Sequence, residues 1–178
     1  MTTLQSLEIF YAQNGYEKDG GAESKWFEVK FPIFTLKLPN PEWRRKIIYL
    51  HDIHHVINGC DTSWKGEAFI AGWEVANGFG RHFPISLLIT WTMGYSMFIN
   101  PKDVVEGYKK GVRDKGVIAL GMQKNDLLSM EFAELKNRVE SPSDSGMGFS
   151  GWLTFILWLI ISQIVLLGPF ILALLIIL

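Results

Sequence analysis

Three of the four histidines lie together in the segment LHDIHHV, residues 50–56. An α-helix advances by about 100° per residue, so His51 and His55 lie about 40° apart on its circumference and Asp52 lies about 100° from His51. On the same scale His54 points away from this arc, at about −60°. His51, Asp52 and His55 can therefore converge on one ion, and imidazole and carboxylate groups are ligands of divalent transition metals.

Two carboxylates follow at helical spacing. Glu67 comes twelve residues after His55, and the Asn58-Gly59 break between them lets a second helix fold back antiparallel and present this carboxylate to the same point. Glu74, seven residues further on, returns to nearly the same helix face, as a further ligand, a partner of a ligand or a catalytic group. The alternative is a polar surface patch, but apolar residues surround the cluster and favour partnered groups. We expect one divalent ion, zinc first, with iron, manganese or cobalt also suited to these ligands.

The spacing of these residues resembles a known family signature. His51-Asp52-x-x-His55, followed after eleven residues by Glu67, is similar to the HDxxH-x11-E motif of the coenzyme Q (ubiquinone) biosynthesis family known as Coq-four. The Gly59 turn also resembles that family, and the resemblance covers residues 41–139. The longer helical region that the family has before the motif is missing, and a membrane segment at the C-terminal end is not a usual feature of it.

The resemblance implies a function. The family works on membrane-borne polyprenyl benzoquinone precursors, removing the ring carboxyl group at C1 with hydroxylation there, and organises other quinone-biosynthesis proteins. It implies that His51, Asp52, His55 and Glu67 bind the metal. The apolar segment 85–99, with Trp73, Phe79 and Trp91, would then line a channel for the isoprenoid tail, or these residues are ordinary core. The basic helix face formed by Lys109, Lys110 and Arg113 has two interpretations as well: it would contact anionic lipid, or it is a solvated face.

A mostly α-helical fold with an N-terminal extended arm would position these residues. The alternation of apolar and polar residues in 25–38 predicts a strand pair or an extended arm. Asn40-Pro41-Glu42, with Asn40 as the cap, predicts a helix that runs to about Asn58, with Gly59 as a left-handed cap. Further helices are expected from residues 61–63 to Gly78 or Gly80, over 85–99, from Asn100-Pro101 onward and as one amphipathic helix over 127–139.

The C-terminal end predicts a membrane segment. Residues 151–178 carry no charge, and about 20 apolar residues suffice to cross a bilayer. Gly168-Pro169 interrupts the run, which fits one kinked span or a hairpin, and we expect the kinked span. The chain thus divides into a metal-binding helical domain (1–140), a linker (141–150) and the membrane segment (151–178).

Charge and composition exclude several classes of protein. A net charge of −1 and a pI near 6.4 argue against nucleic acid as a partner, and one cysteine forms no intrachain disulfide. There is no apolar run near Met1, so we expect the body to stay on the side of synthesis. Lys136 and Arg138 precede the membrane segment, which predicts a cytoplasmic or mitochondrial-matrix location for the body.

Other interpretations of the histidines are weaker. A membrane desaturase needs about eight histidines, and an HD-type phosphohydrolase needs one upstream of His51, which this chain lacks. Cys60 could act as a nucleophile with His82 as its base, but no motif for an oxyanion hole accompanies them, so we expect a buried or capping cysteine. We expect His82 to be a loop or cap residue and leave it out of the metal set. The alternative from another class is a membrane-tethered scaffold of a quinone-biosynthesis complex, in which a closed metal site is structural.

Overall fold

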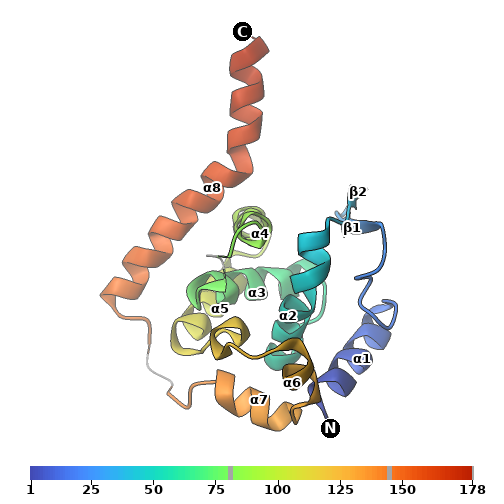
Figure 1. Cartoon of the computed structure of the whole chain (residues 1–178). Helices are drawn as coiled ribbons and strands as arrows, with labels where there is room; N and C mark the ends of the chain where they lie inside the picture. The colour runs from blue at the N-terminus through green and yellow to red at the C-terminus, as the bar shows by residue number, and fades with distance from the viewer. Residues whose placement is uncertain (80–81, 144–145, 178) are drawn as a thin grey trace.

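The structure is a computed structural model that describes residues 1–79, 82–143 and 146–177. It confirms a mostly α-helical fold with an N-terminal extended arm and a long apolar C-terminal helix (Figure 1). Gly80, one expected helix end, lies outside the described residues, as do 144–145 of the linker and Leu178. The elements are α1 (Thr3–Asn14), β1 (Trp26–Lys30), β2 (Thr35–Pro39), α2 (Glu42–Asn58), α3 (Trp64–Ala76), α4 (Ile85–Ile99), α5 (Pro101–Arg113), the 3-10 turn η2 (Val117–Leu120), α6 (Lys124–Ser129), α7 (Phe132–Val139) and α8 (Phe149–Ile177).

α3 lies at the centre of the body and packs against α5 and α4 (Figure 1). Its approach to α5 is close because two glycines face the neighbouring backbone. A β-carbon at Gly72 of α3 would overlap the carbonyl oxygen of Val104, and one at Gly107 of α5 would overlap that of Phe69. Any larger residue would push the two helices apart. This packing fixes the axis of α3 and, with it, the position of Glu67.

α2 ends as expected but begins differently. Gly59 adopts φ 63°, the left-handed conformation that glycine tolerates, and its amide N–H bonds the last turn of α2. The expectation that Asn40 caps the helix is wrong, because Pro41 holds the cap position and no side chain bonds the first amides. The Asn40 amide group instead donates to the carbonyl oxygens of Gly21 and Ser24, and these bonds tie the loop before β1 to the junction of β2 and α2.

β1 and β2 form the predicted extended arm as an antiparallel hairpin in which Trp26 pairs with Pro39 and Lys30 with Thr35. Ser63 caps α3, with its hydroxyl oxygen accepting from the amide of Gly66 at 3.3 Å. α3 then ends at Ala76, close to the expected stop. These outcomes follow from local pattern and capping chemistry.

The expected helix over 127–139 is wrong in one respect: two helices, α6 and α7, replace it. Met130 and Glu131 between them are extended, and Glu131 pairs with Thr2 in an isolated β-bridge. The amide of Phe132 donates to the carbonyl oxygen of Met1 at 3.0 Å, and that of Thr3 donates to Met130 at 2.9 Å. The N-terminal residues thus satisfy the backbone groups that a continuous helix would have paired internally.

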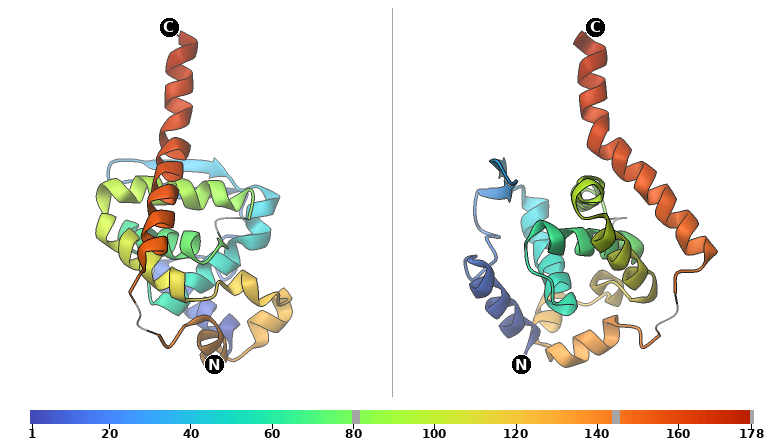
Figure 2. Two further views of the ribbon diagram at one scale, coloured as in Figure 1. Left: turned by 90° about the vertical axis from the view of Figure 1, so that its left-hand side faces the viewer. Right: turned by 180° about the vertical axis from the view of Figure 1, so that it is seen from behind.

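α8 is one helix with Pro169 inside it, so the structure has the kinked helix and not the hairpin. Its first half crosses α4 and packs against it (Figure 2), where Gln163 Nε2 donates to the carbonyl oxygen of Gly94 at 3.2 Å. The helix bends part of the way along, and its second half projects beyond the body (Figures 1 and 2). α8 is long and apolar enough to cross a bilayer, and most of its side chains are exposed, which supports association with a membrane.

Candidate metal centre

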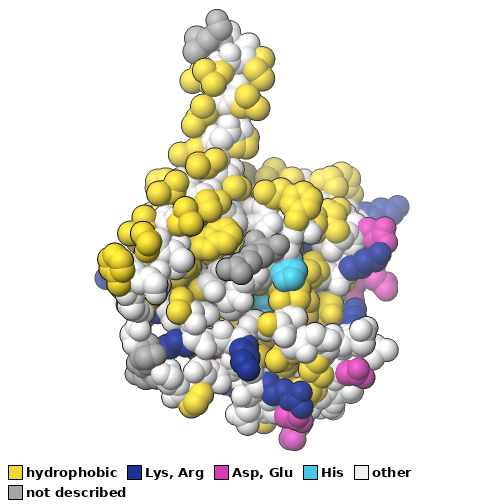
Figure 3. Space-filling model, turned by 60° about the vertical axis from the view of Figure 1, so that its left-hand side comes forward, with side chains coloured by type: hydrophobic (Ala, Val, Ile, Leu, Met, Phe, Trp, Pro, Cys, Tyr) yellow, Lys and Arg dark blue, Asp and Glu magenta, His cyan; other side chains and the backbone are white. Residues whose placement is uncertain are grey.

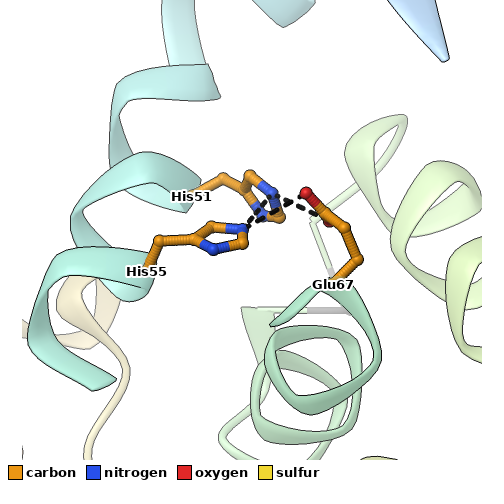
Figure 4. A group of neighbouring side chains, drawn as sticks. All are labelled: His51, His55 and Glu67. Atoms are coloured by element: carbon orange, nitrogen blue, oxygen red, sulfur yellow. Dashed lines mark hydrogen bonds and ion pairs between the residues drawn. The ribbon is translucent and has the colours of Figure 1, made fainter. Parts of the chain in front are cut away.

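Three side chains from α2 and α3 converge on one point. His51 and His55 lie one turn apart on α2, and Glu67 reaches them from the first part of α3 (Figure 4). The Nε2 atoms of the two histidines are 3.2 Å apart. Glu67 Oε2 lies 3.6 Å from His51 Nε2, and Glu67 Oε1 lies 3.5 Å from His55 Nε2.

These distances are of the size found between ligand atoms of a metal site. Zinc binds imidazole nitrogen at about 2.0–2.1 Å, so two ligand atoms of a tetrahedral site lie about 3.3 Å apart. The two histidine nitrogens are 3.2 Å apart, and each lies 3.5 to 3.6 Å from one of the two oxygens of Glu67. His51, His55 and Glu67 each offer one ligand atom within 4.8 Å of the others, so this group could hold a metal ion.

Glu74 lies behind His51, on the side away from Glu67. It is fully buried, and its Oε1 accepts from His51 Nδ1 at 2.9 Å and from His54 Nδ1 at 2.6 Å. A carboxylate on Nδ1 fixes the tautomer in which Nε2 of the same ring carries the free lone pair. This contact therefore orients His51 as a ligand. Glu74 is thus a hydrogen-bond partner of a candidate ligand, one of the three roles expected for it.

His54 is buried behind the cluster, as its position on the helix predicts. Its ring packs on Trp73, with centroids 4.7 Å apart, and on Phe79 at 5.0 Å. Its Nε2 is buried without a hydrogen-bond partner among the described residues, as are His55 Nδ1 and Glu74 Oε2. Burial lowers the pKa of His54 by more than the hydrogen bond to Glu74 raises it, so the ring stays neutral.

The other charges of the cluster attract one another strongly in the metal-free protein. Burial alone would lower the pKa of His51, but the charge of Glu74 and the hydrogen bonds to Glu67 and Glu74 raise this pKa well above the usual 6.5. Burial would raise the pKa of Glu74, but His51 and His54 bring it down to about 2. Similarly, the pKa of Glu67 is held below its usual range, against burial, by His55 and His51. Without metal, the cluster thus holds a proton on His51, which an incoming metal must displace.

The structure does not bring Asp52, the fourth expected ligand, to this point. Its Oδ2 accepts a hydrogen bond from the hydroxyl of Tyr11 on α1 at 2.9 Å. The reason is the packing of α1 on α2, because the Tyr11 hydroxyl holds the Asp52 side chain on the side of α2 that faces α1. Burial raises the pKa of Asp52, and the charges of His51 and His55 oppose this shift, so its carboxylate lies within electrostatic reach of the cluster.

Two of the three candidate ligands are reachable from solvent. The side chain of Glu67 is 26 % exposed and that of His51 19 %, whereas His55 is buried. A pocket of about 390 Å³ lies against α1, with His55, Gly59 and Cys60 among its lining residues. That volume falls within the range of small-ligand pockets. Three protein ligands with an accessible side leave a coordination position for water or substrate.

The remaining candidates lie elsewhere. Cys60 is partly buried beside the end of α2, where burial raises the pKa of its thiol to about 11, so it is a poor nucleophile. His82 is exposed and lies near Phe79, apart from the metal cluster. Lys110 bonds Asn58 and Glu140, at 2.8 and 2.9 Å, so this lysine is a structural link and does not belong to a basic face.

Of the three aromatic residues expected to line a channel, two lie in the core and one is partly exposed. Trp73 and Phe79 are fully buried, and Trp73 Nε1 donates to Asp114 at 2.9 Å, so both are core residues. Trp91 is partly buried and stacks on Tyr95, with ring centroids 5.8 Å apart. Sequence reasoning missed the contacts of Tyr11 and His54, because both depend on how α1 and α3 pack against α2.

Comparisons with protein-family models, with curated proteins and with solved structures find no match to this chain. The case for a function therefore depends on the geometry of the cluster, the motif and the apolar helix.

Proposed function

We propose that this chain is a membrane-associated, metal-dependent enzyme that acts on the head group of a polyprenylated benzoquinone precursor. In the reaction, the C1 carboxyl group leaves as CO2 and a hydroxyl group takes its place, which requires a two-electron oxidant from outside the chain. One observation carries the proposal: His51, His55 and Glu67 converge on one point, with ligand atoms within 4.8 Å of one another and with His51 and Glu67 partly exposed (Figure 4). The motif that joins these residues supports the substrate class.

Each residue has a stated role in this proposal. His51, His55 and Glu67 hold the ion, and Glu74 keeps His51 in the tautomer that binds it. A bound divalent ion, zinc first among the candidates, would supply a Lewis acid that polarises an oxygen of the ring acid. Asp52, held by Tyr11, would add a negative charge beside the cluster.

The apolar helix supports the substrate class. A polyprenyl tail keeps its ring in or at a bilayer, so an enzyme that acts on the ring must work there. α8 can cross a bilayer, and its first half packs on α4 of the body that carries the cluster. The helix thus keeps the cluster close to the membrane that would hold such a substrate.

The scaffold alternative uses the same residues. A structural zinc site has four protein ligands and no open position, whereas a catalytic site has three. The structure brings three groups together, which favours an enzyme. A metal that binds without turnover would favour the scaffold.

The test compares metal content and turnover in the full chain purified in detergent. His55→Ala and Glu67→Ala remove single ligands, and His82→Ala and Glu134→Ala are matched controls on exposed residues outside the cluster. We expect about one equivalent of metal in the wild type and both controls, and loss of metal from the two ligand variants. With O2 supplied as the two-electron oxidant, a prenylated ring acid labelled with ¹³C at its carboxyl group should release ¹³CO2 only with the metal-loaded proteins.

Two results would contradict the proposal in different ways. A wild type that stays metal-free after loading would remove the metal site itself. Full metal occupancy without ¹³CO2 release, and without any co-purified prenylated compound, would replace the enzyme with the scaffold.

A further inference from the structure

The outer face of α4 carries no charge. From Phe83 to Asn100 the sequence has no acidic or basic residue, although α4 lies at the surface of the body. Residues three or four positions apart form its outer stripe, which consists of Leu87, Trp91, Tyr95 and Phe98. Phe98 is 66 % exposed, and Leu87 is half exposed. A helix whose outer face meets water normally carries polar residues on that face, and the outer face of α4 does not.

The turn of the β1–β2 hairpin extends this apolar face. The amide of Phe31 donates to the carbonyl oxygen of Phe34 at 2.8 Å and closes the turn around Pro32 and Ile33. The Ile33 side chain at the tip is 92 % exposed, and Phe34 is half exposed. An isoleucine side chain with this exposure buries almost no apolar surface within the chain, and together with its exposed apolar neighbours it forms a patch of the kind found at interaction sites.

The turn is fixed to the body by aromatic contacts. The ring of Phe31 lies 5.3 Å from that of Tyr95 and 6.2 Å from that of Trp91, both edge to face, and stacks on Phe34 at 4.6 Å. Trp64 Nε1 donates to the carbonyl oxygen of Lys30 at 2.7 Å. These contacts hold the exposed tip beside the outer stripe of α4. We call Ile33, Phe34, Leu87 and Phe98 together the apolar rim.

The apolar rim lies at the end of the body from which α8 projects. In both views of Figure 2, the hairpin and α4 lie at the same end as the free half of α8. Figure 3 shows hydrophobic side chains along this end of the body that continue up α8, with the acidic and basic side chains lower down and at one side. A bilayer that takes the second half of α8 would therefore meet the rim.

The charge around the hairpin favours an anionic bilayer. Residues 25–46 carry six basic residues against two acidic ones, a net charge of +4, whereas the whole chain carries −1 and the remainder therefore −5. Arg44 bonds Asn40 and lies over the ring of Phe27, and Lys46 pairs with Glu42, so the basic residues open to head groups, which we call the basic flank, are Lys25, Lys30, Lys37 and Arg45. Lysine and arginine next to a membrane-inserted apolar patch are attracted by anionic head groups.

We propose that the apolar rim inserts into the interfacial layer of a bilayer that contains anionic lipid, with the basic flank at the head groups. The body then has a second membrane contact besides α8, formed by a hairpin and a helix far from it in sequence. The proposal rests on the membrane association stated above. It fixes how the body is oriented on the bilayer, with α4 and the hairpin turned toward the lipid.

The test places a fluorescent reporter at three sites of the full chain in vesicles of phosphatidylcholine and phosphatidylserine. Single cysteines replace Ile33 at the hairpin tip, Ile171 in α8 and Glu134 in α7, all in a Cys60→Ser background and labelled with an environment-sensitive dye. We expect dyes at 33 and 171 to shift to the blue and to be quenched several-fold more by doxyl-labelled lipid than by aqueous iodide. The dye at 134 should show the reverse.

The outcomes separate this proposal from the membrane association on which it depends. Lipid quenching at 171 without lipid quenching at 33 would overturn the insertion of the rim and leave α8 in the membrane. Shielding of the dye at 33 from both quenchers would also overturn the insertion of the rim, because a protein surface would then cover it. Absence of lipid quenching at 171 would overturn the insertion of α8 itself. Lipid quenching at 33 that persists in pure phosphatidylcholine would overturn the role of anionic lipid.

Discussion

The replacement of Glu74 by glutamine tests whether this carboxylate orients His51 for metal binding. Both hydrogen bonds to Glu74, from His51 and from His54, go to the same oxygen, Oε1, and the other oxygen has no partner among the described residues. Glutamine keeps a carbonyl oxygen that can accept both bonds, and its amide nitrogen takes the unpartnered position. The change therefore removes a charge and leaves the shape of the site intact.

The expected loss follows from that charge. A hydrogen bond to a carboxylate is about twice as strong as one to a neutral acceptor. Loss of such a partner behind a ligating histidine weakens metal binding by about 10- to 100-fold, which corresponds to about 1.4 to 2.7 kcal/mol. The pKa of His51 should fall as well, because the charge of Glu74 is the largest effect that raises it.

These two effects separate in a metal titration against a competing chelator at several pH values. In the wild type, affinity should keep rising with pH well above 6.5, because the metal displaces a proton from His51. In Glu74→Gln, affinity should level off at a lower pH and at a weaker limiting value. Equal limiting affinity and an unchanged pH dependence in the two proteins would refute the orienting role.

Three further predictions concern stability. Gly107→Ala should lower the free energy of unfolding by about 1–3 kcal/mol because the new methyl group overlaps the backbone of α3, whereas Gly148→Ala, where nothing lies within 4 Å, should change it little. Tyr11→Phe should lower it by about 1–3 kcal/mol because Asp52 loses its donor, which a thermal melt of the metal-free protein measures. Acid should also destabilise the metal-free protein: the pKa of Glu74 is about 2 in the folded state, so its contribution is present above pH 4.5 and is lost as the pH falls toward 2. Unfolding midpoints in chelator at pH 3 and pH 6 that coincide would contradict this.

The part of the site that depends on one helix or on two consecutive helices could be predicted from the sequence. His51 and His55 share a face because they lie one turn apart, and Gly59 lets Glu67 return to them. The direction of Asp52 was not predictable, because it depends on the Tyr11 hydroxyl of a helix 41 residues away. His54 could be placed behind the cluster, but its bond to Glu74 depends on how deeply α3 packs.

The fold shows the same division. The bounds of α4 and the left-handed end of α2 follow from local signals at Pro84, Asn100 and Gly59. The break between α6 and α7 does not, because Met1 and Thr3 impose it by hydrogen bonds to the backbone of Phe132 and Met130, on either side of Glu131. A periodic apolar pattern continues through such a break, and only tertiary pairing reveals it.

The metal cluster and the apolar rim share a support in the first turns of α3. Trp64, the first residue of this helix, bonds the hairpin at Lys30, and its ring lies 4.6 Å from Tyr95 of the α4 stripe. Glu67 follows Trp64 by three residues, so it lies on the next turn of the same helix. Gly72 fixes the later part of α3 against α5, and Trp64 ties its first residue to the hairpin, so the turns between them, which carry Glu67, are held on both sides. The residue that completes the metal cluster is thus carried by the segment that anchors the hairpin beside α4.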